Sequence, residues 1–125
     1  MNKQRKILVI EDDEDLLFAY CKILTNAGFE ARGARDAFEA AQSFERWRPD
    51  LIITDILLPK LDAVEMISLF RTDPAIADIP ILAITAYYEE STRALAAGAR
   101  AVILKPASED ELIRIVEAHL PQDPR

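Results

Sequence analysis

Four short apolar runs in this chain each end in a polar residue. They are ILVI before Glu11 and Asp12, LIIT before Asp55, ILAI before Thr85 and AVIL before Lys105. Near-continuous runs of Val, Ile and Leu are typical of strands that are covered by helices on both faces. Because the carboxyl ends of parallel strands meet at one edge of a sheet, the pattern predicts a single site with three carboxylates, a hydroxyl and an ammonium.

Turn and cap signals divide the chain into five strand–helix units. Strands are predicted near residues 6–10, 29–34, 50–54, 80–84 and 100–104. Helices are predicted at 13–27, at Asp36–Trp47, at 63–72, before Gly98 and from about Ser108. Gly28 is placed to end the first helix, and Ser108 with Glu111 has capping-box spacing. The alternation is typical of an α/β fold with a parallel sheet, right-handed crossovers and helices on both faces.

Composition favours one soluble, acidic domain. A length of 125 residues with a hydrophobic fraction of 50% is enough for one packed core, so we expect a single domain over residues 1–125 with no output domain. The net charge of -7 disfavours nucleic acid and anionic membranes as partners, because both carry negative charge. The apolar run after the basic start MNKQRK is too short for a signal or membrane segment.

Cysteine and histidine are too scarce for a soft metal site. Cys21 and His119 are the single residues of their types, so neither an internal disulfide nor a thiolate or imidazole cluster is possible. We therefore expect the cytosol as the compartment. A bound metal must be a hard cation with oxygen ligands, which points to Mg²⁺, with Mn²⁺ or Ca²⁺ as alternatives.

The predicted site has the groups that phosphoryl chemistry needs. Carboxylates within roughly 5 Å repel by about 3 kcal/mol per pair at an effective dielectric near 20, and protons or a divalent cation must relieve this repulsion. Lys105 is expected to pair with Asp55 at rest and with a phosphoryl oxygen when one is present. With the Thr85 hydroxyl and a metal, it would neutralise a phosphoryl group moving in line onto Asp55, the nucleophile.

A family resemblance rests on four segments taken in order and spacing. They are LVI with Glu11 and Asp12, IIT with Asp55 and the following ILLP, Ile84-Thr85-Ala86, and Lys105-Pro106. Together they resemble the receiver domain of two-component response regulators, over a core of about residues 6–120. The resemblance implies a doubly wound, flavodoxin-like sheet of five parallel strands in the order 2-1-3-4-5.

The same resemblance assigns roles to individual residues. It implies that Asp55 accepts a phosphoryl group from a phosphohistidine on a histidine kinase or phosphotransfer domain, and that this switches affinity for a downstream protein. Mg²⁺ would be held by Glu11, Asp12, Asp55 and the backbone carbonyl of Leu57, with Asp12 the more direct ligand of the first two. The chain would be a signalling domain rather than an enzyme, a monomer or weak dimer that assists its own phosphorylation and dephosphorylation.

The resemblance also covers the opposite side of the site. Thr85 and Lys105 would bind the phosphoryl oxygens and form part of the switch. A cis peptide bond before Pro106 is expected to aim Lys105 inward.

Several positions depart from the family pattern. Receivers usually carry Tyr or Phe three residues before the lysine, and this chain has Val102, which has no ring to relocate. We expect the readout to be weaker, or to be carried by the loop after Thr85, where Tyr87 and Tyr88 lie. Leu57 and Tyr87 flank the site, and we expect them to hinder water and lengthen the acyl-phosphate lifetime.

Other functions remain open at this point. A phosphorylation-independent interaction module on the same fold is favoured by Val102 and disfavoured by the intact acidic, hydroxyl and lysine residues. A phosphatase of the haloacid dehalogenase type needs an acid two residues after its nucleophile, where this chain has Leu57. Nucleotide binding has little support, because Gly28, Gly33 and Gly98 form neither G-x-G-x-x-G nor a P-loop.

Overall fold

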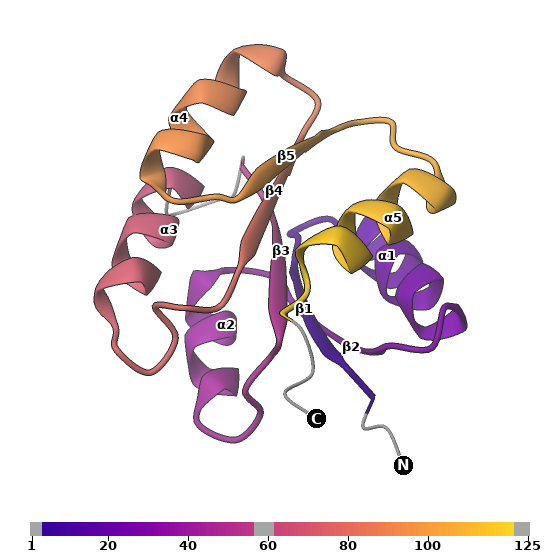
Figure 1. Cartoon of the computed structure of the whole chain (residues 1–125), viewed down its shortest axis with the longest axis horizontal. Coiled ribbons are helices and arrows are strands. Elements are labelled where there is room, and N and C mark those ends of the chain that lie inside the picture. The colour runs from indigo at the N-terminus through magenta and orange to yellow at the C-terminus, as the bar shows by residue number, and fades with distance from the viewer. Residues whose placement is uncertain (1–3, 57–61, 122–125) are drawn as a thin grey trace.

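A parallel sheet of five strands forms the centre of the protein (Figure 1). The computed structural model describes residues 4–56 and 62–121. The strands are β1 (Lys6–Ile10), β2 (Glu30–Ala34), β3 (Leu51–Asp55), β4 (Ile81–Thr85) and β5 (Ala101–Leu104). Their order in the sheet is β2-β1-β3-β4-β5, which confirms the doubly wound topology that the family resemblance implied.

Helices cover both faces of this sheet. They are α1 (Glu14–Asn26), α2 (Ala37–Phe44), α3 (Ala63–Thr72), a 3-10 turn η1 (Tyr88–Glu90), α4 (Ser91–Ala97) and α5 (Glu109–His119). One face carries α1 and α5, and the other carries α2, α3 and α4 (Figure 1). Among the described residues, none of the helices has the length and apolar character to cross a bilayer.

The sheet divides the hydrophobic core into two clusters, one on each face. Every residue of β3 and β4 is buried, as the near-continuous apolar runs predicted. Strand β2 lies at the sheet edge and is partly exposed, which explains why residues 29–34 carry no such run. The strands that end in Asp55 and Thr85 are therefore the most deeply buried ones.

Helix α2 is shorter than predicted, since it ends at Phe44 and not at Trp47. The Trp47 indole is buried against β2, where its Nε1 donates a hydrogen bond to Glu30 Oε2 at 3.0 Å. The Arg32 guanidinium lies 4.8 Å from the centre of the indole ring. These contacts, together with Pro49 two residues later, turn the chain out of the helix before Trp47.

Arg71 joins the end of α3 to two neighbouring segments. Its Nη1 donates to the backbone carbonyls of Ala77 at 2.8 Å and Ile79 at 2.7 Å, in the connection to β4. Its Nη2 donates to the carbonyl of Gly98 at 2.8 Å, just after α4. One half-buried guanidinium thus satisfies carbonyls from the α3–β4 connection and the end of α4.

Gly98 is expected to tolerate a side chain less well than Gly28. Both glycines have positive φ, but a Cβ at Gly98 would lie 3.0 Å from Arg71 Cγ, whereas nothing lies within 4 Å of one at Gly28. We expect Gly28→Ala to lower the free energy of unfolding by about 1 kcal/mol and Gly98→Ala by about 2 kcal/mol or more. Urea unfolding followed by Trp47 fluorescence measures both, and equal losses would contradict the steric argument.

Candidate functional site

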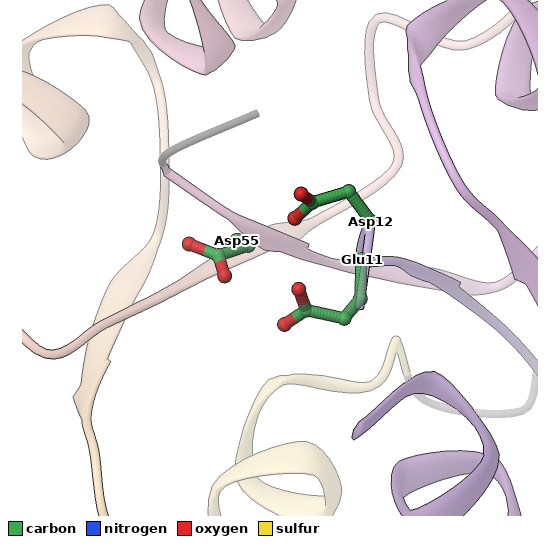
Figure 2. Close-up of side chains that lie close together, drawn as sticks. All are labelled: Glu11, Asp12 and Asp55. Carbon is green, nitrogen blue, oxygen red and sulfur yellow. The ribbon is translucent and has the colours of Figure 1, made fainter. Parts of the chain in front are cut away.

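Three carboxylates meet at the carboxyl edge of the sheet (Figure 2). Ile10 of β1 pairs with Thr54 of β3, so Glu11 and Asp55 come next on neighbouring strands, and Asp12 follows in the loop. One carboxylate oxygen from each of the three residues lies within 4.8 Å of the other two. The structure thus brings together the acidic residues that the sequence pattern predicted to meet.

Glu11 is an acid held almost completely out of water, since the residue is only 1% exposed. Its Oε2 accepts a hydrogen bond from the backbone N–H of Asp13 at 3.2 Å, and its Oε1 lies 3.4 Å from Lys105 Nζ. The pKa of Glu11 is raised from 4.5 to about 7, chiefly by burial and also by the nearby Asp55, while the Asp13 N–H and the Lys105 charge act in the opposite direction. Near neutral pH, this carboxyl therefore exchanges between its protonated and ionised forms.

Lys105 supplies the positive charge of the site. Its Nζ lies 2.8 Å from Asp55 Oδ2, and its backbone N–H donates to the carbonyl of Thr85 at 2.8 Å. Burial alone lowers the pKa of Lys105, but the hydrogen bond and charge of Asp55, with the charge of Glu11, outweigh it and raise the pKa above its ordinary value. The peptide bond between Lys105 and Pro106 is cis.

Thr85 ends β4 on the same edge, and the residue is 1% exposed. Its Oγ1 accepts a hydrogen bond from the backbone N–H of Tyr87 at 3.0 Å, which leaves the hydroxyl proton to act as a donor. The side chains of Tyr87 and Tyr88 are largely exposed just after it. The hydroxyl is thus tied to the first residues of the β4–α4 connection.

The remaining predicted residues lie elsewhere. Val102 is half-buried in β5, opposite Ala83 of β4, and packs against the core cluster on the α2–α3–α4 face. Leu57, predicted to offer its carbonyl to a metal and to flank the site, lies outside the described residues. The segment that would complete the metal ligands is therefore not part of the described geometry.

Tyr20 in α1 is an electrostatic neighbour of the site that sequence reasoning missed as a site residue. Burial raises the pKa of Tyr20, and the Lys105 charge opposes this while Glu11 and Asp55 reinforce it. In the sequence, Tyr20 belongs to the apolar stripe of the first helix, and helical spacing alone does not distinguish a core tyrosine from one beside charged groups.

The donor set fits a small hard cation. Opposite ligands of Mg²⁺ are separated by about 4.1 Å, because each Mg–O distance is about 2.0–2.1 Å. The 4.8 Å limit on the three carboxylate oxygens is close to that span, so small side-chain movements suffice. Among the described residues, Glu11, Asp12 and Asp55 are the residues that would hold such an ion.

An aspartate-centred acidic site on a sheet of order 2-1-3-4-5 is typical of flavodoxin-like signalling domains. The family model of the response regulator receiver domain matches residues 7–117. The chain belongs to this family. Receiver domains are signalling domains of two-component systems, with a regulatory rather than catalytic role, and they interact with histidine kinases or phosphotransfer proteins.

Individual relatives agree with this assignment. The alkaline phosphatase synthesis transcriptional regulatory protein PhoP of Bacillus subtilis is 37% identical, over 96% of this chain and 49% of its own length. The chain thus spans about half the length of PhoP.

Solved structures agree as well. Chemotaxis response regulator CheY4 of Vibrio cholerae has a TM-score of 0.87 at 25% identity, over 93% of this chain and 98% of its own. The receiver domain of sensor histidine kinase PA1611 from Pseudomonas aeruginosa has a TM-score of 0.84 at 29% identity, over 93% of this chain and 97% of its own. In that crystal structure, a magnesium ion is coordinated in the active site cleft.

Proposed function

We propose that this protein is a Mg²⁺-dependent phosphoacceptor, in which Asp55 receives a phosphoryl group from the phosphohistidine of a kinase or phosphotransfer partner. The observation that carries the proposal is the 2.8 Å contact between Lys105 Nζ and Asp55 Oδ2, inside a cluster of three carboxylates. After transfer, the ammonium that pairs with Asp55 at rest would pair with an oxygen of the phosphoryl group. Changed affinity for a downstream protein would be the output.

The transfer can be written with these side chains. An Asp55 carboxylate oxygen attacks phosphorus, the phosphorus–nitrogen bond breaks, and the partner's imidazole leaves with its electron pair. The Lys105 ammonium and the Thr85 hydroxyl donate hydrogen bonds to the phosphoryl oxygens as charge moves onto them. A Mg²⁺ ion held by Glu11, Asp12 and Asp55 would supply charge neutralisation at this site.

Phosphodonor labelling tests the proposal. Incubation with a small phosphodonor such as acetyl phosphate and MgCl₂ is expected to add one phosphoryl group to the wild-type protein, detected by intact-mass spectrometry. Asp55→Asn, which keeps the size of the side chain but removes the nucleophile, is expected to stay unlabelled. Omission of Mg²⁺ should greatly slow labelling of the wild type. Equal labelling of both proteins, or of neither, would contradict the proposal.

One observation favours an alternative, in which the protein binds partners independently of phosphorylation. Val102 has no ring to move, and it packs against the core cluster that includes α3 and α4 residues.

If the protein is a phosphoacceptor, its signal needs a route other than the ring of a residue at position 102. We propose the β4–α4 connection, since Thr85 Oγ1 accepts a hydrogen bond from the N–H of Tyr87 and any shift of Thr85 would act directly on this segment.

A phosphoryl mimic separates the two readings. With MgCl₂ and beryllium fluoride, we expect the largest backbone amide shifts at residues 85–88 and small ones along β5, in ¹H–¹⁵N spectra. Asp55→Asn serves as the control for non-specific effects of the reagents. Shifts centred on β5 would contradict the proposed route, and an unchanged spectrum would favour the phosphorylation-independent module.

A further inference from the structure

Helices α2 and α3 lie on the same face of the sheet (Figure 1). An open apolar groove lies between them. Its volume is about 650 Å³, within the range of ligand and peptide sites. Six apolar side chains line most of it: Phe38, Ala41 and Phe44 from α2, and Met66, Leu69 and Phe70 from α3. Their spacing along each helix puts them on one stripe, so the two stripes form the walls of the groove.

Two of the residues that line the groove are exposed to solvent. Phe38 is 70% exposed and Leu69 is 59% exposed, although both are large apolar residues. The rings of Phe44 and Phe70 meet edge to face at 5.2 Å and join the two helices. A pocket for a small molecule encloses most of its ligand, whereas exposed apolar walls on parallel helices suit the apolar face of a third helix.

Negative charge gathers at one end of the groove. Glu45 and Asp73 are the C-cap residues of α2 and α3, so each carboxylate lies at the negative pole of a helix dipole. Neither forms an ion pair within residues 4–56 and 62–121. Arg48 also lines the groove, but its guanidinium is held by Asp78 at 2.9 Å. This end therefore favours a cation on whatever occupies the groove.

We propose that the α2–α3 groove docks an amphipathic helix of a partner protein, with apolar side chains in the groove and a Lys or Arg beside Glu45 and Asp73. The helices run from the carboxyl edge of the sheet, where Asp55 lies, back to the opposite edge. The acidic end is therefore remote from the phosphoacceptor site, and a partner could bind there without covering Asp55. The proposal is independent of whether Asp55 is phosphorylated.

Two designed peptides test the proposal with the whole 125-residue chain. Each has about 14 residues and the same leucine stripe at helical spacing, flanked at both ends by lysines in one peptide and by glutamates in the other. Flanking both ends makes the test independent of the direction in which the helix lies. We expect the lysine peptide to bind with micromolar affinity by fluorescence anisotropy, to shift amides of α2 and α3 in ¹H–¹⁵N spectra, and to bind at least about tenfold more tightly than the glutamate peptide.

Matched variants locate the binding. Phe38→Ser should weaken binding of the lysine peptide about tenfold or more. Phe18→Ser should leave this binding unchanged, because Phe18 lies on α1 on the other face of the sheet, although it is as exposed as Phe38 at 70%. Glu45→Gln combined with Asp73→Asn should weaken binding about threefold to tenfold and reduce its salt dependence. Asp110→Asn combined with Glu117→Gln, two exposed acids of α5, makes the same change in net charge and should leave binding unchanged.

Other results would overturn the proposal. Absence of binding by the lysine peptide at millimolar concentration would do so, as would equal binding of the two peptides or equal effects of Phe38→Ser and Phe18→Ser. A wild-type dimer in sedimentation that Phe38→Ser converts to a monomer would assign the groove to a second copy of this chain. Dodecyltrimethylammonium below its micelle concentration, if it shifted the same amides while the lysine peptide did not, would assign the groove to a small cationic amphiphile.

Discussion

In the absence of divalent cations, the protein should lose stability as the pH rises from about 5 to 8, and Glu11→Gln should remove most of this loss. The pKa of an ordinary glutamate carboxyl is 4.5, and that of Glu11 in the folded protein is about 7. Between these values, the folded state holds a proton that the unfolded chain releases, so the free energy of unfolding falls as the pH rises. The full shift corresponds to up to about 3 kcal/mol.

The measurement is urea unfolding at several pH values in EDTA, followed by the fluorescence of Trp47, the single tryptophan. Taking the difference between wild type and Glu11→Gln removes the contribution of titrating groups that do not interact with Glu11. At pH 8 the glutamine variant should be the more stable protein, and at pH 5 the two should be similar. Adding MgCl₂ at pH 8 should stabilise the wild type more, since the proposed ion needs the ionised carboxylate. A difference that does not vary with pH would contradict the buried-acid argument.

Replacing Arg71 with leucine should lower the free energy of unfolding by about 3 kcal/mol or more. The guanidinium donates to the carbonyls of Ala77, Ile79 and Gly98, and leucine leaves these acceptors without it. Hydrogen bonds from a charged donor contribute about 1.5–3 kcal/mol each, and half-buried carbonyls that lose them pay a desolvation cost. Arg71→Lys should recover part of the loss, because one ammonium cannot copy the planar fork of donors.

Arg35→Leu is the matched control for this prediction. Arg35 also makes two ionic contacts, to Glu14 at 2.7 Å and to Glu39 at 3.5 Å, but its side chain is 54% exposed. Exposed pairs of this kind contribute less than about 1 kcal/mol. Urea unfolding of both variants should therefore show a several-fold difference between the two losses. Similar losses would mean that the contacts of Arg71 are no stronger than surface ion pairs.

The fold was largely predictable because burial leaves a plain signal in the sequence. Strands β1, β3 and β4 need apolar residues at nearly every position. The four apolar runs that end in polar residues identified these three strands and β5. The end of α2 was not predictable, since Trp47 fits the helical pattern as well as Phe44 does. Pro49 limits how far the helix can extend, but the contact that draws Trp47 out of it is long-range, the indole hydrogen bond to Glu30.

The site followed from topology more than from local sequence. Residues at the carboxyl ends of neighbouring parallel strands share one edge of the sheet. Glu11, Asp55 and Lys105 do so, and Lys105 Nζ lies within hydrogen-bonding range of both carboxylates. Properties that depend on how deeply a side chain is buried could not be predicted from the sequence. The pKa of Glu11 reflects its burial, and the role of Tyr20 as a charged-site neighbour depends on how α1 packs.

The ammonium of the site comes from late in the chain, 94 residues after Glu11 and 50 after Asp55. During synthesis on a ribosome, a nascent chain presents both acids long before Lys105 emerges. Until then, the two carboxylates lack their counter-charge, and the edge of the sheet that they share resists closure. Arrival of β5 thus couples folding of the last strand of the sheet to assembly of the charged site.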